Sequence, residues 1–140
     1  GSEMCIRDRA VILGVLLLFA NFGSVASAAN TSYVHFEFRW NSPYDATYRQ
    51  QKWTKSYIYF KSTKCTRPWY TVTPYIHSYL VGGKGNTSIG SSRRIYGNHT
   101  YYITNYAVEK YGKGNNVWLE ASSWGNGSAY GTWHADCGKY

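Results

Sequence analysis

The chain has 140 residues, a net charge of +8 and many aromatic residues, including 15 tyrosines and 6 tryptophans. This length suits one domain with one core, and the basic excess favours an anionic partner, although a basic surface that only keeps the protein soluble is the alternative. Only five acidic residues follow the first 28 positions, and no Gly-x-Ser-x-Gly motif occurs, so neither paired-carboxylate glycosidase chemistry nor a serine hydrolase is supported.

An export signal is predicted at the start of the chain. Residues 10–20 are an uncharged apolar run that follows basic residues, and an Ala-Ser-Ala site for signal peptidase ends at Ala28. The run is too short to span a bilayer comfortably. We therefore expect residues 1–28 to be a signal peptide and residues 29–140 to form a single secreted β domain without an integral membrane span.

The first nine residues, GSEMCIRDR, resemble the translated sequencing adapters found at the starts of some gene models. On that interpretation residues 1–9 are a non-native scar and Cys5 is not part of the protein. The alternative is an ordinary basic start of a signal peptide. The two basic and two acidic residues of this stretch cancel, so the whole charge of +8 belongs to the secreted domain.

Two cysteines follow the leader, Cys65 and Cys137. An even number of cysteines in an exported chain is typical of a disulfide, and a bridge that closes so long a loop stabilises a domain by about 4 kcal/mol. Two free thiols are the alternative. Neither cysteine has a CxxC partner or a histidine at zinc-finger spacing, so we expect no metal and no cofactor.

The first strand is predicted over residues 33–40, where apolar and polar residues alternate. The residues expected to face the core are Val34, Phe36, Phe38 and Trp40. A second strand is predicted over residues 55–61, with Tyr57 and Tyr59 facing outward. A third alternating stretch covers residues 70–81, and Pro74 within it implies an edge position, a bulge or two shorter strands.

The second half of the chain continues the pattern of short strands and turns. Further strands are expected over residues 94–96, 100–106, 116–122 and 129–135. One short helix is possible over residues 105–111, with Asn105 as its cap and Gly112 as its stop. The fold class predicted is therefore all-β, a small antiparallel β-sandwich or barrel of six to seven short strands.

One polar group has the residue types of an acid–base catalyst. His35, Glu37 and Arg39 point the same way from an alternating strand, and such a set supplies the acid, base and phosphate clamp of small secreted ribonucleases. The alternative is an ordinary exposed face of a strand. The other histidines show no spacing that indicates a metal site; they are His77, His99 and His134.

The aromatic residues are more numerous than one small core requires, so several must reach the surface. Exposed aromatic rows suit sugar rings and protein partners, although tyrosine also suits a solvated sheet face. The candidate binding residues are Tyr57, Tyr59, Tyr75, Tyr79, Arg93 and Arg94.

Several short motifs resemble a loose group of small secreted proteins of Firmicutes-type bacteria. The matching segments are KSYIYFKS at residues 55–62, ITNYAVEK at residues 103–110, VWLEASS at residues 117–123 and GTWHADC at residues 131–137. The resemblance implies export, but it brings no activity and no site residue. Small secreted β-sandwich bacteriocins share the size and the basic, aromatic composition, without shared motifs.

The function that these features favour is non-enzymatic. We expect a secreted β domain that binds an anionic or glycan partner at or near the cell envelope, and nucleic acid is not the expected partner. The alternatives are a bacteriocin-like toxin and a small secreted hydrolase such as a ribonuclease.

Overall fold

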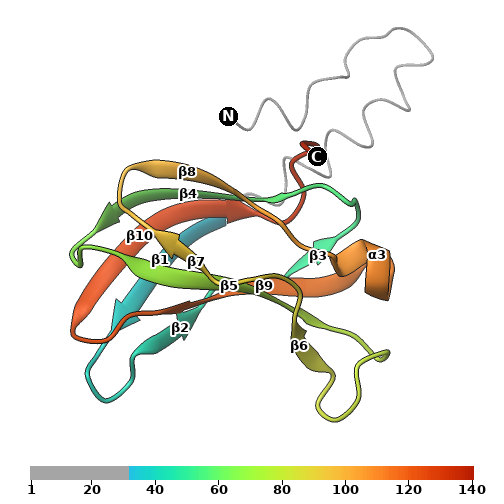
Figure 1. Ribbon diagram of the computed structural model, residues 1–140, viewed down its shortest axis with the longest axis horizontal. Coiled ribbons are helices and arrows are strands. Elements are labelled where there is room, and N and C mark those ends of the chain that lie inside the picture. The colour runs from blue at the N-terminus through green and yellow to red at the C-terminus, as the bar shows by residue number, and fades with distance from the viewer. Residues whose placement is uncertain (1–31) are drawn as a thin grey trace, which may run out of the picture.

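The computed structural model describes residues 32–140, and the structural statements below concern this part of the chain. Two antiparallel sheets pack face to face (Figure 1). The predicted all-β class is confirmed, and of the two predicted architectures the domain has the sandwich. The predicted signal peptide, residues 1–28, lies outside the described residues.

The first sheet has four strands in the order β1-β10-β4-β8. Their bounds are Ser32–Phe38 for β1, Gly127–His134 for β10, Ile58–Cys65 for β4 and His99–Ile103 for β8. Strand β1 pairs with β10 over its whole length, from Ser32 opposite Trp133 to Phe38 opposite Gly127. The last strand of the sandwich therefore lies in the middle of a sheet, beside the first.

The second sheet has two long central strands, β9 (Asn115–Ser122) and β5 (Tyr70–His77), each flanked by two short ones. The short strands beside β9 are β2 (Tyr44–Ala46) and β3 (Gln50–Lys52), and those beside β5 are β6 (Asn86–Ser88) and β7 (Arg93–Ile95). The domain thus has ten strands where six or seven were predicted. The strands without a prediction are β2, β3 and β6, and three residues are too few for alternation to be visible in a sequence.

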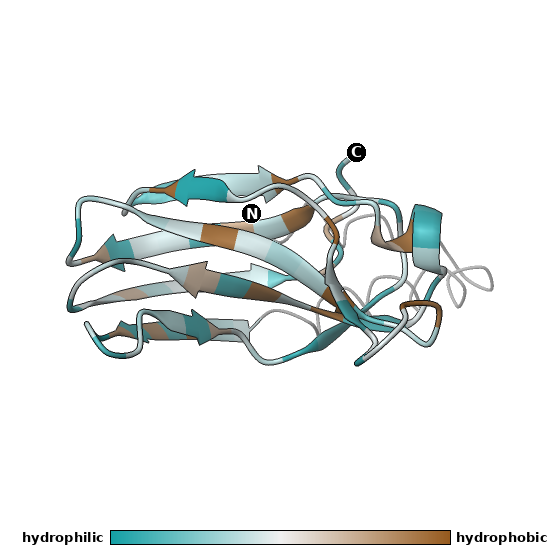
Figure 2. Ribbon diagram, turned by 60° about the horizontal axis from the view of Figure 1, so that its bottom comes forward, coloured by the Kyte–Doolittle hydropathy of each residue, from teal (hydrophilic) through white to brown (hydrophobic). Residues whose placement is uncertain are grey.

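Alternation along the longer strands builds the core between the sheets. Every second residue of β5, starting at Tyr70, is buried, and hydrophobic and hydrophilic residues alternate along the strands (Figure 2). Phe36, Phe38, Phe60 and Trp133 are among the fully buried side chains, and Phe36 and Phe38 contact the ring of Tyr70.

Trp40 was predicted to face the core, and this is wrong. Strand β1 ends at Phe38, and Arg39 exchanges backbone hydrogen bonds of 3.1 and 2.9 Å with Ser42 in a tight turn. The turn breaks the alternation, so the Trp40 side chain is 78% exposed.

Strand β5 remains continuous through Pro74. It pairs with β9 on one side over nearly its whole length, whereas the strand on its other side is divided into β7 and β6. The carbonyl of Pro74 accepts a hydrogen bond from the Ile89 N–H (2.9 Å) in the gap between them. The missing proline N–H faces the same gap and removes no ladder bond. The break in the sheet at Pro74 therefore lies in the neighbouring strand, which is divided into β7 and β6, and not in β5 itself.

The predicted short helix is present as α3 (Ala107–Tyr111). Tyr106 occupies the N-cap position, one residue later than predicted, but the Asn105 Oδ1 accepts a hydrogen bond from the Ala107 N–H at 3.3 Å. Gly112 ends the helix with φ 89°, a conformation that favours glycine. Across residues 32–140, no helix has the length and apolar character needed to cross a membrane.

The predicted disulfide between Cys65 and Cys137 is wrong, because both cysteines are free. Cys65 is the last residue of β4, whereas Cys137 lies beside the residue before β4, with its thiol 3.5 Å from the Tyr57 carbonyl oxygen. An eight-residue strand separates them, which is about 25 Å at about 3.3 Å per residue. A disulfide needs Cα atoms within about 7 Å.

We expect both thiols to be alkylated when the purified protein is unfolded in iodoacetamide without a reducing agent. Peptide mass mapping should show carbamidomethyl groups on Cys65 and on Cys137, because neither is bridged. A peptide pair joined through these two residues that appears only without reductant would contradict the structure.

The strand directions sort the connections into two ends. The end we call the loop end lies at the left of Figure 1 and carries the turns at residues 39–43, 66–69, 96–98 and 123–126. The opposite end, the helix end, carries the start of β1, helix α3 and residues 135–140.

Candidate functional site

The four candidate tyrosines do not form one row. Tyr59 belongs to the first sheet, Tyr57 is the residue before its strand β4, Tyr75 belongs to the second sheet, and Tyr79 lies in a loop at the helix end. Tyr59 faces outward as predicted, but it is buried because its ring stacks on His134 at 4.5 Å and meets Tyr102 edge-on.

The two candidate arginines also separate, because adjacent residues of a strand point to opposite sides. Arg93 reaches the ring of Tyr101, with 5.3 Å from its guanidinium carbon to the ring centroid. Arg94 lies on the outer face of the second sheet, 4.1 Å from the centroid of Trp69. Only Arg94 belongs to the site described below.

The structure brings His35 and Glu37 together. The His35 Nε2 lies 2.9 Å from the Glu37 Oε1, and the imidazole stacks on Tyr130 at 4.5 Å. Both side chains are about half exposed, and a polar contact in such surroundings contributes little to stability. Arg39 lies beyond the end of the strand in the turn, and it lines one cavity together with Glu37.

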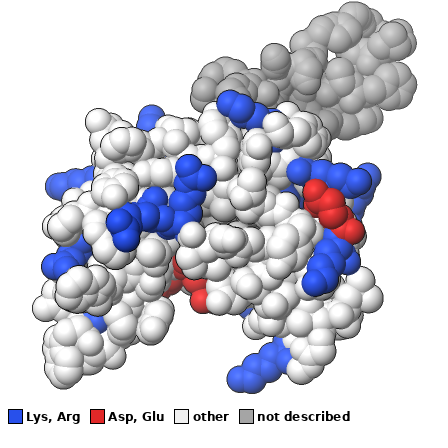
Figure 3. Space-filling view, in the orientation of Figure 1, with Lys and Arg blue, Asp and Glu red and all other residues white. Residues whose placement is uncertain are grey.

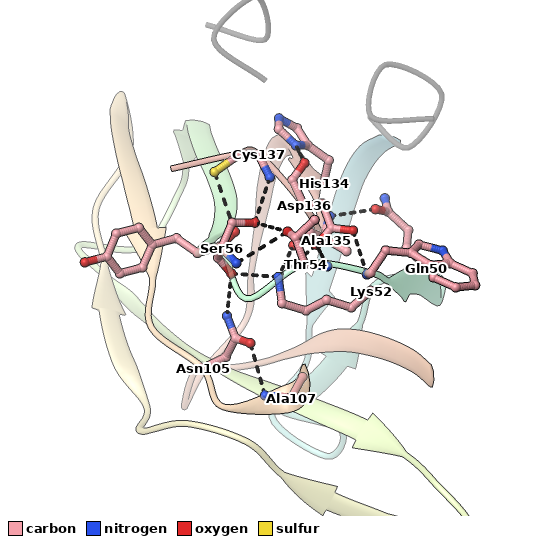
Figure 4. Close-up of polar contacts among 12 residues, drawn as sticks. Gln50, Lys52, Thr54, Ser56, Asn105, Ala107, His134, Ala135, Asp136 and Cys137 are labelled. Atoms are coloured by element: carbon pink, nitrogen blue, oxygen red, sulfur yellow. Dashed lines mark hydrogen bonds and ion pairs between the residues drawn. The ribbon is translucent and has the colours of Figure 1, made fainter. Parts of the chain in front are cut away.

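The densest polar cluster lies at the helix end and is buried (Figure 4). The Lys52 ammonium donates to the carbonyl oxygens of Ser56 and Ala135, both at 2.7 Å, and to the Asp136 carboxylate at 3.1 Å. That carboxylate also accepts the backbone N–H groups of Trp53 (2.8 Å) and Thr54 (3.1 Å), and the Thr54 hydroxyl (2.8 Å).

All three ammonium protons of Lys52 are therefore used within the protein. Burial lowers the pKa of Lys52 below its usual value, and the charge of Asp136 opposes that shift. The cluster joins the segment around β3 to residues 135–137, which follow the last strand. We assign it a structural role, because no donor of Lys52 is left to hold a ligand.

A cleft at the loop end has the character of a binding site. Its volume is about 280 Å³ and most of its lining surface is apolar. The lining residues are Pro43, Tyr44, Trp69, Thr71, Ser122, Ser123 and Trp124.

One row of residues across the second sheet forms the floor. Tyr44 lies opposite Ser122, Ser122 opposite Thr71, and Thr71 opposite Arg94. Residues directly opposite each other in a sheet project from the same face, so their side chains lie side by side. The hydroxyls of Thr71 and Ser122 are 2.6 Å apart.

Two tryptophans from different turns stand beside this row. Trp69 precedes β5, and Trp124 follows β9 in the turn that leads to β10. The Arg67 guanidinium donates to the Trp124 carbonyl (3.1 Å) and lies over its ring at 5.9 Å. The Ser123 N–H donates to the Pro43 carbonyl (3.1 Å), which joins the two turns that carry the cleft walls.

Each tryptophan of the loop end has an arginine beside it. Trp69 has Arg94 and Trp124 has Arg67, in the contacts given above. The third pair is Trp40 and its sequence neighbour Arg39 in the turn after β1. Figure 3 shows Lys and Arg at both ends of this face, whereas the acidic residues visible on it lie below its centre and towards the helix end.

A second, more polar cavity of about 500 Å³ lies at the same end. It is lined by Glu37, Phe38, Arg39, Trp40, Asn41, Asn126, Gly127 and Ser128. The Trp40 N–H donates to the Asn126 Oδ1 at 2.8 Å, which fixes the turn after β1 against the turn before β10. The turn of residues 40–44 contributes to the walls of both cavities.

The sequence reasoning missed Tyr44, Trp69 and Trp124. It searched for aromatic rows along alternating strands, whereas these residues lie in turns or at a strand end. A signal was present: Trp69 follows Arg-Pro and Trp124 precedes Gly-Asn-Gly. A tryptophan in a turn next to proline or glycine is poorly placed for a core and reaches the surface unless another element covers it.

Comparison with known proteins adds little to this description. No family model matches the chain, and no curated protein matches it in sequence. Among solved structures, the chain is similar to one described as the crystal structure of PirA, at 13% identity and a TM-score of 0.46, over 73% of this chain and 91% of that one. The function is therefore inferred from the cleft itself.

Proposed function

We propose that this domain binds a carbohydrate, without catalysing a reaction on it, in the cleft between Trp69 and Trp124. The observation that supports this most is the combination of flat aromatic walls and a hydroxyl floor. A sugar ring has an apolar C–H face that packs against an aromatic ring, and hydroxyls at its edge that exchange hydrogen bonds. Thr71, Ser122 and Ser123 supply hydroxyl partners at the base of the cleft.

The size of the cleft favours part of a chain over an enclosed small molecule. At about 280 Å³ it lies just below the range of pockets that bury drug-sized ligands, about 300 to 1,000 Å³. An open cleft of this size receives one sugar ring while the rest of the glycan continues outside.

The lining also supports a binding role over a catalytic one. Its seven residues include no carboxylate, imidazole, thiol or amine, and hydrolysis of a glycosidic bond ordinarily uses two carboxyl groups. If the predicted export signal operates, a glycan of the cell envelope or its surroundings is the partner that the cleft meets.

Replacing Trp69 or Trp124 with alanine should weaken glycan binding by about 30-fold, the effect of an aromatic hot-spot residue worth about 2 kcal/mol. Affinity gel electrophoresis against a panel of soluble polysaccharides identifies a retarding glycan, and titration calorimetry with that glycan measures the change.

Tyr79→Ala is the matched control, because Tyr79 is 97% exposed in a loop at the helix end. We expect this variant to bind like the unaltered protein. No retardation by any glycan at low salt, or equal loss of binding in the Tyr79 variant, would show that the cleft is not a carbohydrate site.

A further inference from the structure

We propose that the carbohydrate is a uronate-containing polysaccharide that crosses the turn of residues 40–44 and occupies both cavities of the loop end. This inference rests on the proposed function, because it names the ligand class of the same site. It adds two elements: a requirement for carboxylate groups on the sugar, and a second subsite around Arg39.

The first argument is charge. The loop end carries Arg39, Arg67 and Arg94 close to its three tryptophans, and none of them has an ion-pair partner within residues 32–140. Two acidic residues, Asp45 and Glu37, also lie at this end, and each has partners within the protein. Asp45 accepts the backbone N–H groups of Glu37 (2.9 Å) and Ala46 (2.8 Å), and Glu37 contacts His35. The three arginines outnumber these two acids, so the loop end keeps an excess of positive charge beside aromatic surface.

The second argument is the shape of the charged groups. A guanidinium presents a planar fork of N–H donors that matches a carboxylate at two points. An aromatic wall requires a ring to cover it. A uronic acid supplies both in one residue, since its carboxylate projects from the edge of the pyranose ring. A chain of glycerol phosphate supplies the charge but no ring.

The third argument is the position of the two cavities. The cleft holding Trp69 and the polar cavity holding Arg39 lie on either side of one turn. Trp40 and Tyr44, which are 78% and 71% exposed, lie near the two ends of that turn. One ring fills one cavity, whereas a polymer passing over the turn engages both, so its affinity grows with chain length.

Titration calorimetry with oligogalacturonates of increasing length tests the proposal. We expect affinity to rise with length until the chain spans both cavities, and to fall as salt is added. Arg94→Gln should weaken binding of acidic oligomers of every length by about tenfold, as expected for the loss of one charge-assisted contact. Arg39→Gln should weaken only the longer oligomers.

Lys84→Gln is the matched control, because it removes one positive charge from the exposed loop at the helix end. Equal losses of affinity in the Lys84 and Arg94 variants would show that binding depends on net charge and not on a specific site. That result would overturn the inference. Uncharged cello-oligosaccharides that bind as tightly as the acidic oligomers would also overturn it, while leaving the proposed function intact.

Two other results separate the remaining cases. Affinity that does not change with oligomer length would overturn the inference that a second subsite lies around Arg39. Tight binding of a glycerol-phosphate polymer, with no binding of oligogalacturonate, would overturn the assignment of a uronate as the ligand. Failure to bind any glycan, acidic or neutral, would instead remove the proposed function.

Discussion

Replacing Asp136 with alanine should lower the free energy of unfolding by about 3 to 5 kcal/mol, the cost of removing one partner of a buried ion pair. The change leaves the Lys52 ammonium buried with one of its three acceptors missing. It also leaves the N–H groups of Trp53 and Thr54 without the carboxylate that accepts them. Urea denaturation followed by tryptophan fluorescence measures the change, which is a large part of the total stability of a domain this size.

Glu109→Ala serves as the control, because Glu109 is an exposed acid on helix α3 whose charge acts on Lys52 without a hydrogen bond to it. We expect a change within about 0.5 kcal/mol for this surface substitution. The double variant Lys52→Met, Asp136→Leu removes both charges and should recover part of the lost stability. A loss for Asp136→Ala no greater than that of the control would show that the cluster does not hold the C-terminal segment in place.

The second large effect is expected from Gly131→Ala. Gly131 lies in β10 between β1 and β4, where the register with β4 shifts at a bulge. An added Cβ would lie within van der Waals overlap of the Lys61 carbonyl oxygen, a backbone atom that no side-chain rotation can move. Two strands of the first sheet must separate locally, which we expect to cost about 3 kcal/mol, the upper end for overpacked positions.

Gly82→Ala tests whether the loss at Gly131 comes from the contact and not from the substitution itself. A Cβ at Gly82 meets nothing within 4 Å, so this variant should be neutral or more stable by about 0.4 to 1 kcal/mol through the unfolded chain. The same urea denaturation compares the two variants. Equal midpoints for both alanine variants would contradict the close packing of β10 against β4.

The fold class was predictable because its longer strands are regular. The apolar positions of β1 and β5 recur at every second residue, and this period survives in the buried sets of both strands. Three of the short flanking strands were not predicted, since β2, β3 and β6 have three residues each and exist through pairing with β9 and β5. Local sequence does not encode that pairing.

The predictions of the disulfide and of the binding site were wrong for the same physical reason, which is that each depends on distances set by the fold. An even number of cysteines is compatible with a disulfide, but the distance between Cys65 and Cys137 is set by the fold, which places them at opposite ends of β4. The cleft likewise combines turns that are distant in sequence and become neighbours when β9, β5 and β2 align. Of the candidate binding residues, Arg94 alone lies beside the cleft, because β7 places Arg94 opposite Thr71 and its guanidinium over the Trp69 ring.

The separation of the two ends of the sandwich also affects how the domain can be attached to something else. Ser32, where β1 begins, and residues 135–140 both lie at the helix end, away from the turns that carry the tryptophans. A fusion partner, purification tag or solid support joined through either of these positions therefore leaves the loop end unobstructed. The architecture favours oriented immobilisation, in which every copy on a sensor chip or resin presents the same face to the solution.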